Sequence, residues 1–562
     1  MGVPSGIYRG RADRPARNRG GLSISQARIE SERRWGRRFF GVVVAVWLGT
    51  VAAFGAIAVN WYLHVSLAQF ALMVVFLFSF AFVFTKRLLS LFLSPYELPS
   101  LERLPRQPKV AILYATMNDV VPECVRAIRQ TYPCDVFVLD DSSDPEKRAI
   151  VEHLAADMHF RILHRPNRKA FKAGAINAWL RERGSAYDYF VLLDADSALP
   201  PDWVERALRY AEHPDNADLA IFQGMVNIWN TDRPFPGALA PAHVLSRDEW
   251  ERKLAGYLGT VVCYGHNVLL RTAPVIEVGG FDERYVSEDF ATAIRLANAG
   301  YGSAFVPLHS WEAMPENVRG FIKRQNKWTR GSMEFFSFVP PAKISLSKKI
   351  VLLMIPFGHL AYVAIFAAIL IAVFGRYSSF NQFLAFGQNL VSAPIEYIWS
   401  IPLFRFIILL SAVTSVFTLA KILQVRLRFV DFYRARNLSR AVGAIMLPHE
   451  VRSMIMYLVD RKRRFPVTPK DEPPMTMREI LHMGRGTVAM IGLLSVGLLL
   501  INPVGLYYNL LWLVPFYLSP LVIHHYCGPR TAPKASANGG TKDLLADSRL
   551  ATSVDRPRNR WC

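Results

Sequence analysis

The stretch Tyr189-Phe-Val-Leu-Leu-Asp-Ala-Asp196 decides the fold of the central part of this chain. Its five apolar residues, Tyr189 to Leu193, have the length and composition of a buried β-strand. Two carboxylates, Asp194 and Asp196, follow where that strand ends. Carboxylates placed in this way suit a hard divalent cation that bridges to phosphate oxygens. Because Asp-x-Asp is common, the interpretation depends on what surrounds it.

A second predicted strand that ends in an acidic residue precedes this one. An apolar run from Lys109 to Thr116 is followed by a helix candidate after Pro122 and by Asp135-Val-Phe-Val-Leu-Asp140. In open α/β sheets, ligands bind beyond the carboxyl ends of the strands. We therefore expect Asp140 to lie at the same sheet edge as Asp194, although an Asp in this place can also cap the next helix.

A basic segment lies between the two acidic motifs. In Arg168-Lys-Ala-Phe-Lys172-Ala-Gly174-Ala-Ile-Asn177, the glycine permits a close backbone approach and Lys172 can meet a phosphate or ribose. Without the neighbouring acids, a solvated basic loop would be the simpler interpretation.

Two further motifs follow. Ser287-Glu288-Asp289 opens a helix candidate that Gly300 ends. The two acids either stabilise the helix N-terminus or supply a general base. Phe321 to Gly331 contains Arg324-Gln325-Asn326-Lys327-Trp328, in which Trp can stack on a sugar and the cations can hold a diphosphate. By itself this segment also fits an interfacial helix with an anchoring Trp.

Composition places the α/β region in a membrane protein. The 562 residues are 52% hydrophobic, and the mean hydropathy is +0.18. Apolar runs with at most one charge predict six spans of a bilayer. They are Phe39–Val59, Ser66–Phe84, Val351–Phe374, Phe406–Leu423 with Lys421 inside it, and about 487–504 and 506–523.

Charge sets the expected orientation. Residues 1–38 carry ten Arg and three acids, and residues 424–485 include Arg461-Lys-Arg-Arg464. The positive-inside rule then places both termini, the α/β domain and the 424–485 loop on the cytoplasmic side of a bacterial inner membrane. The net charge of +21 is explained by this rule, so we expect no nucleic-acid partner. The five cysteines, Cys124, Cys134, Cys263, Cys527 and Cys562, are expected to be reduced thiols rather than disulfides or zinc ligands.

The order of these motifs resembles the family 2 inverting glycosyltransferases. The arrangement of spans around the catalytic region resembles the processive branch, which includes bacterial cellulose synthase and the hyaluronan and chitin synthases. Phe465-Pro-Val-Thr-Pro-Lys470 matches the Phe-x-Val-Thr-x-Lys gating loop of cellulose synthase-like enzymes. The resemblance covers roughly residues 40–525 and implies a GT-A type α/β domain inserted in a bundle of about six transmembrane helices.

The resemblance also implies a role for each motif residue. Asp289 would be the catalytic base, with Glu288 beside it, and Trp328 would stack near the acceptor. Asp194 and Asp196 would position the UDP-sugar and Mg²⁺ or Mn²⁺. The other residues expected to bind the UDP-sugar are Asp140, Lys172, Arg324, Lys327, Thr468 and Lys470.

Two motifs depart from the family pattern. The family's Gln-x-x-Arg-Trp becomes Arg324-Gln325-Asn326-Lys327-Trp328, and Ser287 stands where Thr is usual. Lys is a point charge whereas Arg offers a planar fork, so the diphosphate contact and the acceptor type are affected more than the reaction class. We expect no PilZ domain for cyclic di-GMP in this chain.

The sequence thus predicts a processive hexosyltransferase that polymerises UDP-glucose into a β-linked polysaccharide and passes it across the membrane. Alternatives are a chitin- or hyaluronan-like amino-sugar polymer synthase, a non-processive transferase to a lipid phosphate, and a non-catalytic subunit of an export complex. Expected partners are the UDP-sugar, the growing polysaccharide, membrane lipid and periplasmic export subunits. The predicted divisions are 1–38 (disordered), 39–87 (two spans), 105–348 (catalytic), 349–425 (two spans), 426–485 (gating loop), 486–526 (two spans) and 527–562 (disordered).

Overall fold

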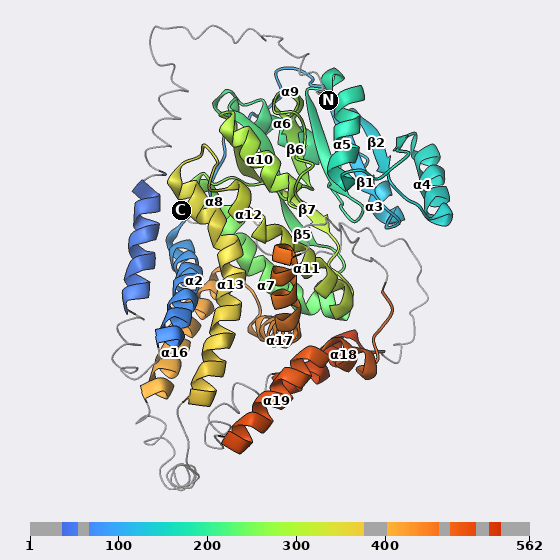
Figure 1. Ribbon diagram of the computed structural model, residues 1–562. Helices are drawn as coiled ribbons and strands as arrows, with labels where there is room; N and C mark the ends of the chain where they lie inside the picture. Colours follow the sequence, from blue (N-terminus) through green and yellow to red (C-terminus); the bar gives the residue numbers. More distant parts are fainter. Residues whose placement is uncertain are drawn as a thin grey trace, which may run out of the picture.

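A seven-stranded mixed sheet forms the centre of the molecule in the computed structural model (Figure 1). The structure describes residues 36, 38–53, 67–375, 402–459, 472–501 and 516–529. Thr468 and Lys470 lie outside the described residues, as do residues 1–35 and 530–562 of the ends expected to be disordered. Cys527, by contrast, is buried at the end of a helix, so the expected disordered tail does not begin at this residue. The strands are β1 (Val110–Thr116), β2 (Cys134–Asp140), β3 (Arg161–His164), β4 (Tyr189–Asp194), β5 (Leu219–Ile228), β6 (Val268–Arg271) and β7 (Gly302–Glu312).

The strand order is β3-β2-β1-β4-β6-β5-β7. Strands β1 to β4 are parallel neighbours, and β5 is parallel to β7. Only β6 is antiparallel to its two neighbours, β4 and β5. The carboxyl ends of the other six strands therefore meet at one edge of the sheet, and this edge carries Asp140 and Asp194 as the sequence predicts.

Helices cover both faces of the sheet because alternate strand residues point to opposite sides. Leu113, Phe190 and Leu192 pack with α5 (Phe171–Glu182), α9 (Thr272–Glu277) and α10 (Glu288–Asn298) on one face. Ile112, Val191 and Leu193 pack with α3 (Pro122–Arg126), α4 (Pro145–Met158) and α6 (Trp203–Ala211) on the other. The result is an α/β domain built on a mixed sheet, in agreement with the α/β class expected for this part of the chain.

Long helices leave the domain on the side of the strand carboxyl ends (Figure 1). Helix α2 packs against α13 and α16, while α17 packs against α7 and α11. The remaining elements are short connections or helices of the same group. Their bounds are α2 (Leu67–Phe92), α7 (Pro234–Glu249), the π-helical turn η3 (Trp250–Leu254), α8 (Ala255–Leu258), α11 (Val318–Met333), α12 (Phe335–Phe338), α13 (Leu346–Gly375), α16 (Pro402–Gln424), α17 (Phe429–Val459), α18 (Met477–Met483), α19 (Arg485–Ile501), and the 3-10 turns η1 (Gly184–Ala186) and η2 (Pro214–Asn216).

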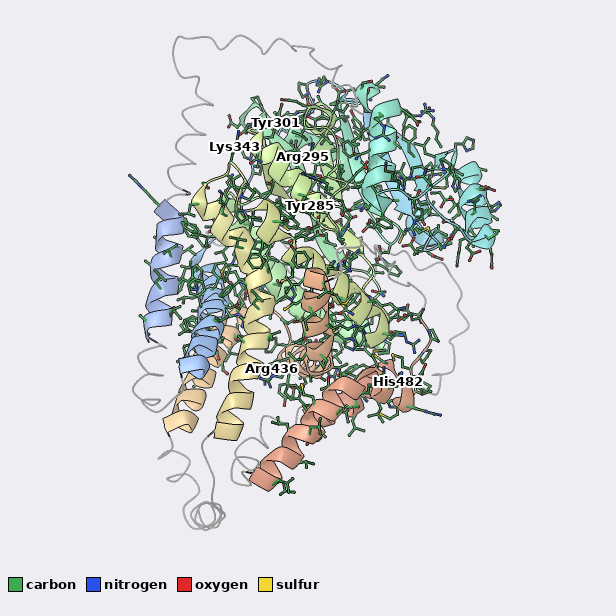
Figure 2. The ribbon with its side chains drawn as sticks, in the orientation of Figure 1. Tyr285, Arg295, Tyr301, Lys343, Arg436 and His482 are labelled. Carbon is green, nitrogen blue, oxygen red and sulfur yellow. The ribbon has the colours of Figure 1, made fainter. Side chains whose placement is uncertain are left out.

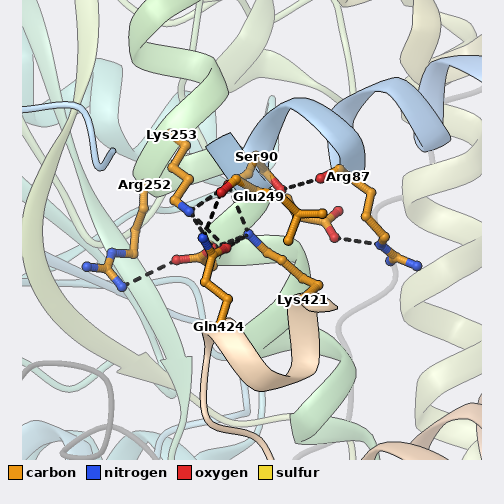
Figure 3. A network of polar contacts seen from close by, with 9 residues as sticks. Arg87, Ser90, Glu249, Arg252, Lys253, Lys421 and Gln424 are labelled. Atoms are coloured by element: carbon orange, nitrogen blue, oxygen red, sulfur yellow. Dashed lines mark hydrogen bonds and ion pairs between the residues drawn. The ribbon is translucent and has the colours of Figure 1, made fainter. Parts of the chain in front are cut away.

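A buried polar network joins α2, η3 and α16 at the end of α7 (Figure 3). Lys421 is fully buried and contacts the Asp248 carboxylate. Lys253 donates to the Ser90 carbonyl at 2.7 Å and lies 3.4 Å from Asp248. Arg87 of α2 bonds Glu249 at 2.8 Å. Lys421 therefore has a specific partner in the domain, which explains a charge in an otherwise apolar run.

Among the described helices, none combines the length and apolar composition needed to cross a bilayer alone. The pair Met477–Met483 and Arg485–Gly497, bent by 70°, meets these requirements when taken together. Arg38–Ala53 and Ala412–Gln424 are shorter apolar helices. Parts of four expected spans, those that begin at residues 39, 66, 487 and 506, lie outside the described residues.

Candidate active site

A cavity of about 660 Å³ opens at the sheet edge where the strand carboxyl ends meet. Its lining comes from the strands β1, β4 and β7 and from the helices α5, α7, α10, α11 and α13, together with the turn η3. The cavity extends to His359 of α13, below the α/β domain. Among the residues that line it are Thr116, Asp141, Lys172, Asp194, Asp196, His266, Glu288, Asp289, Glu312, Arg324, Gln325, Lys327 and Trp328.

Lys172 and Asp194 form an ion pair in this cavity. The Lys172 ammonium also donates to the Gly265 carbonyl at 2.7 Å. Burial alone would lower the pKa of Lys172, but the carboxylates of Asp194 and Glu288 raise it above its ordinary value. Burial acts against the charge of Asp194, but Lys172 and His266 hold the pKa of that carboxyl far below its usual range. Both groups are therefore charged at neutral pH.

Glu288 and Asp289 open α10 and line the same cavity. Asp289 accepts a hydrogen bond from the Phe290 N–H at 2.7 Å. Burial, together with the charge of Asp289, raises the pKa of Glu288 to about 8. Burial also raises the pKa of Asp289, against the opposing pull of Lys172. A carboxylate whose pKa is raised is a better proton acceptor near neutral pH, which suits a general base.

Asp140 takes a different place from the one its motif suggests. Its carboxylate is buried, accepts from the Ser142 N–H at 2.9 Å and does not line the cavity. The next residue, Asp141, does line it and is paired with Arg165, whose Nε lies 3.0 Å from Oδ1. Successive residues at a strand end point to opposite sides. The Asp-Asp pair therefore divides into one carboxylate that holds the turn and one that faces the cavity.

Helix α11 brings the cationic and aromatic residues of the basic motif to the cavity. The Arg324 guanidinium lies over the Trp328 ring, 4.6 Å from its centroid. The Trp328 side chain is 48% exposed, so one face is accessible. Lys327 reaches the acidic groups, since its charge lowers the pKa of both Glu288 and Asp289. The structure thus brings Lys172, Asp194, Asp196, Glu288, Asp289, Arg324, Lys327 and Trp328 together around one cavity.

Several residues that line the cavity have buried polar atoms with no hydrogen-bond partner among the described residues. They include Glu251 Oε2, Arg324 Nε, Gln325 Oε1 and His266 Nδ1. Burial raises the pKa of Glu251 to about 8, and its Oε1 accepts from the Tyr264 hydroxyl at 3.2 Å. An unsatisfied buried polar atom is costly, so this region suits a ligand rich in hydroxyl groups.

Sequence reasoning missed several of these residues. His266 lies 3.5 Å from Glu312 through Nε2, and Glu251 lies in a π-helical turn, a feature often found at functional sites. Asp141 could have been predicted from the sequence, because it follows Asp140 at the end of the strand. His266, Glu251 and Glu312 belong to no motif, and only the fold brings them to the cavity.

The described residues hold no cluster of three or more His, Cys, Asp or Glu side chains that could cage a metal ion. Asp194 and Asp196 nevertheless line the same cavity as Lys327 and Arg324. Mg²⁺ commonly binds through one or two protein carboxylates together with substrate phosphates and water. The two aspartates fit an ion of this kind, which arrives with its phosphate ligand.

The model for glycosyl transferase family group 2 matches residues 189–428, from the start of β4 to the residue before α17. This match, over 240 of the 562 residues, indicates a glycosyltransferase of family group 2. Glucans biosynthesis glucosyltransferase H of Rhodopseudomonas palustris is 27% identical over 259 residues, which cover 40% of this chain and 35% of the relative. The enzyme of the same name from Nitrosomonas europaea is 29% identical over 240 residues, covering 38% and 27%. The chain therefore spans about a third of the length of these relatives.

Two solved structures are similar to this chain at low identity and low TM-score. A mannosyltransferase from Pyrobaculum calidifontis, in complex with GDP-Man and Mn²⁺, is 19% identical with a TM-score of 0.41 and covers 59% of this chain and 96% of that one. TarS of S. aureus, in complex with UDP, is 13% identical with a TM-score of 0.33, covering 65% and 95%. The family 2 resemblance is confirmed at the level of the family, and the cellulose synthase-like branch remains a prediction.

Proposed function

We propose that this glycosyltransferase adds hexosyl units from a UDP-sugar to a β-linked polysaccharide, and that the donor is UDP-glucose. The observation that carries the proposal is the pair Glu288 and Asp289, with raised pKa values, in the same cavity as the Lys172–Asp194 ion pair. The glucose donor is supported by the names of the curated relatives, which are glucosyltransferases of glucans biosynthesis.

The donor would lie along the carboxyl ends of the strands. Asp141 and Arg165 lie at the β2 end, where a nucleoside could bind, and Lys172 and Lys327 could meet the diphosphate. Asp194 and Asp196 would hold Mg²⁺ or Mn²⁺ with that diphosphate, and the ion would offset the negative charge that develops on the leaving UDP. Asp140 would support this end by holding the turn at Ser142.

The acceptor would occupy the part of the cavity that runs from Trp328 toward Glu251 and His359. Sugar hydroxyls could satisfy the buried polar atoms of Glu251, Arg324 and Gln325. The exposed face of Trp328 is suited to a sugar ring. In this arrangement the acceptor hydroxyl reaches Asp289 from the side opposite to the diphosphate.

Chemistry then follows in one displacement. Asp289 takes the proton of the acceptor hydroxyl, and the oxygen attacks the anomeric carbon while the bond to the UDP oxygen breaks. Lys172, Lys327 and Arg324 offset the charge on the departing diphosphate. Because there is a single displacement, an α-linked donor gives a β-linked product, and no second nucleophilic carboxylate is needed.

We also propose that the enzyme is a multi-pass protein of the bacterial inner membrane with a cytoplasmic active site. Large apolar side chains are exposed on α16, including Val416 at 65% and Leu423 at 68%. Leu493 and Leu500 of α19 are 74% and 77% exposed. Exposed apolar surface of this extent is typical of a membrane or partner contact. The product would pass outward between these helices, with the 465–470 loop closing over the donor.

The test uses sealed inverted membrane vesicles that contain the chain, Mg²⁺ or Mn²⁺, and one radiolabelled donor at a time. The donors are UDP-glucose, UDP-N-acetylglucosamine and UDP-glucuronate, with Asp289→Asn vesicles as the control. High-molecular-weight label from UDP-glucose, absent in the mutant, is the expected result. Label from UDP-N-acetylglucosamine would instead show an amino-sugar polymer. Label only in a small lipid product would show a non-processive transferase and contradict the proposal.

A further inference from the structure

The start of α10, which carries Glu288 and Asp289, is not capped by its own residues. Ser287 occupies the N-cap position, but its side chain accepts no hydrogen bond from the helix. The Ser287 hydroxyl instead donates to the Gly331 carbonyl at 3.2 Å and to Glu334 Oε2 at 2.9 Å. An N-cap serine usually bonds the first turn of its helix, so another group must hold this segment in place.

That group is the buried carboxylate of Glu334, at the junction of α11 and α12. It accepts from the Val286 N–H at 2.8 Å and from the Ser287 N–H at 3.0 Å, besides the Ser287 hydroxyl. Glu334 is only 8% exposed, and no ion pair to it is found among the described residues. Its charge is therefore satisfied by the two residues that immediately precede the catalytic acids. Hydrogen bonds to an ionised acceptor are about twice as strong as neutral ones.

Two ring contacts flank this carboxylate. Tyr285 packs against Phe338 with centroids 5.0 Å apart, and Phe290 packs against Phe335 at 5.1 Å. Figure 2 shows Tyr285 at the lower side of the α/β domain, below Arg295 and Tyr301 and nearer to the long helices. Residues 285–290 are thus held on both sides of Glu288 and Asp289 by the same short stretch, 331–338.

We propose that Glu334 is a positioning residue that ties the catalytic base to helix α11. This inference rests on the proposed function, in which Asp289 is the base and Trp328 of α11 meets the acceptor. Helix α11 then carries Trp328, which would stack on the acceptor, near its middle. At its end it carries Glu334, which holds the segment that precedes Asp289. Binding of the acceptor against Trp328 and placement of Asp289 are thereby mechanically linked. Misplacement of a reacting group by 1 Å can lower a rate about 100-fold.

The direct test is hydrogen–deuterium exchange of the full-length chain in detergent, with Glu334→Gln compared with wild type. The N–H groups of Val286 and Ser287 are the donors to Glu334, so their exchange reports the contact itself. Both N–H groups bond Oε2, and a neutral amide oxygen is a weaker acceptor than a carboxylate oxygen, so we expect faster exchange in peptides that contain 286–287. Unchanged exchange would overturn the proposal, whether or not the enzyme is active.

The functional arm measures transfer in the same variants. We expect Glu334→Gln to lower kcat about 10–100-fold with little change in the KM for the donor. Ser287→Ala should add little to it in the double variant, because both changes break one contact. Ser337→Ala is the matched control, since its hydroxyl bonds only the Glu334 backbone carbonyl, at 2.6 Å. An unchanged kcat in Glu334→Gln, with active wild type, would overturn the positioning role. Inactive wild type would count against the proposed function, and the exchange result would still stand.

Discussion

Gly265 sets how closely the chain approaches Asp289. Its φ is +75°, and a Cβ placed there would lie 2.9 Å from Asp289 Oδ2. Its carbonyl also accepts from Lys172 at 2.7 Å. Because Gly265 has no side chain, the carboxylate of Asp289 and the ammonium of Lys172 can both lie next to it.

We expect Gly265→Ala to lower kcat about 10–100-fold, because the methyl group pushes Asp289 out of line. Gly259→Ala is the matched control, since Gly259 also has a positive φ, +54°, but no atom within 4 Å of an added Cβ. Both variants carry similar backbone strain. Steady-state kinetics in vesicles would separate them, and equal losses in both would show that strain, not contact with Asp289, is responsible.

The paired acids Glu288 and Asp289 predict an unusual pH dependence. Burial raises the pKa of both, while Lys172, Lys327 and, for Asp289, His266 act in the opposite direction. Since the base must be deprotonated, kcat/KM should rise with pH, and its acid limb should lie above the ordinary range of Asp. Two interacting groups titrate as a pair.

The Glu288→Gln variant tests this account. It removes one titrating group and one negative charge beside Asp289, so the acid limb should become a single step at lower pH. The measurement is kcat/KM against pH for both proteins. An acid limb that stays where it is, or moves to higher pH, would contradict the pairing of these carboxylates.

Residue by residue, the sequence indicated the acids and cations of the site, but not all of their orientations. Lys172, Asp194, Asp196, Glu288 and Asp289 lie in motifs, and all of them line the cavity. Asp140 does not, because the alternation of side chains at the end of β2 turns Asp141 to the cavity instead. Glu334 could not be identified, because its partners lie about 47 residues away in the sequence and are brought to it only by the fold.

Among the elements, the strands that end in acids were predictable and the later strands were not. Val110–Thr116, Cys134–Asp140 and Tyr189–Asp194 match the expected strands, and α10 ends at Asn298, just before Gly300. Strand β5 is a buried run that includes Gln223 and Asn227, so it lacks a clear period. Strand β6 has four residues and runs antiparallel, which depends on its neighbours rather than on its own sequence.

The buried polar network around Asp248 and Lys421 connects the α/β domain to α2 and α16 (Figure 3). Removing one partner of a buried ion pair leaves a desolvated charge, which costs ~3–5 kcal/mol. Because Lys253 and Arg252 remain 3.4 Å from Asp248, we expect Lys421→Met to lower the free energy of unfolding by somewhat less, about 2–3 kcal/mol. Thermal unfolding of the detergent-solubilised chain gives the comparison.

The control for that comparison is Arg206→Ala. Arg206 pairs with Asp202 at 3.5 Å on α6, with side chains 46% and 54% exposed. An exposed pair of this kind contributes at most about 1 kcal/mol. If Lys421→Met and Arg206→Ala have equal effects, the buried network is not what holds the helices to the domain.

At the scale of the whole molecule, the α/β domain and the long helices meet at the catalytic cavity. The cavity is lined by strand ends above and reaches His359 of α13, which lies 3.6 Å from Glu450 of α17. A site open to both parts suits an enzyme that elongates a chain and moves it onward. The proposal that the protein inserts into a membrane is supported by the composition of the sequence and by the exposed apolar side chains of α16 and α19.

The measurement that tests the central claim most directly compares Asp289→Asn with wild type for two properties, transfer from UDP-glucose and binding of UDP. The account predicts that kcat falls at least ~100-fold while the affinity for UDP is unchanged, because Asp289 meets the acceptor hydroxyl and not the nucleotide. Substantial transfer by Asp289→Asn, or a parallel loss of UDP binding, would contradict the assignment of Asp289 as the base.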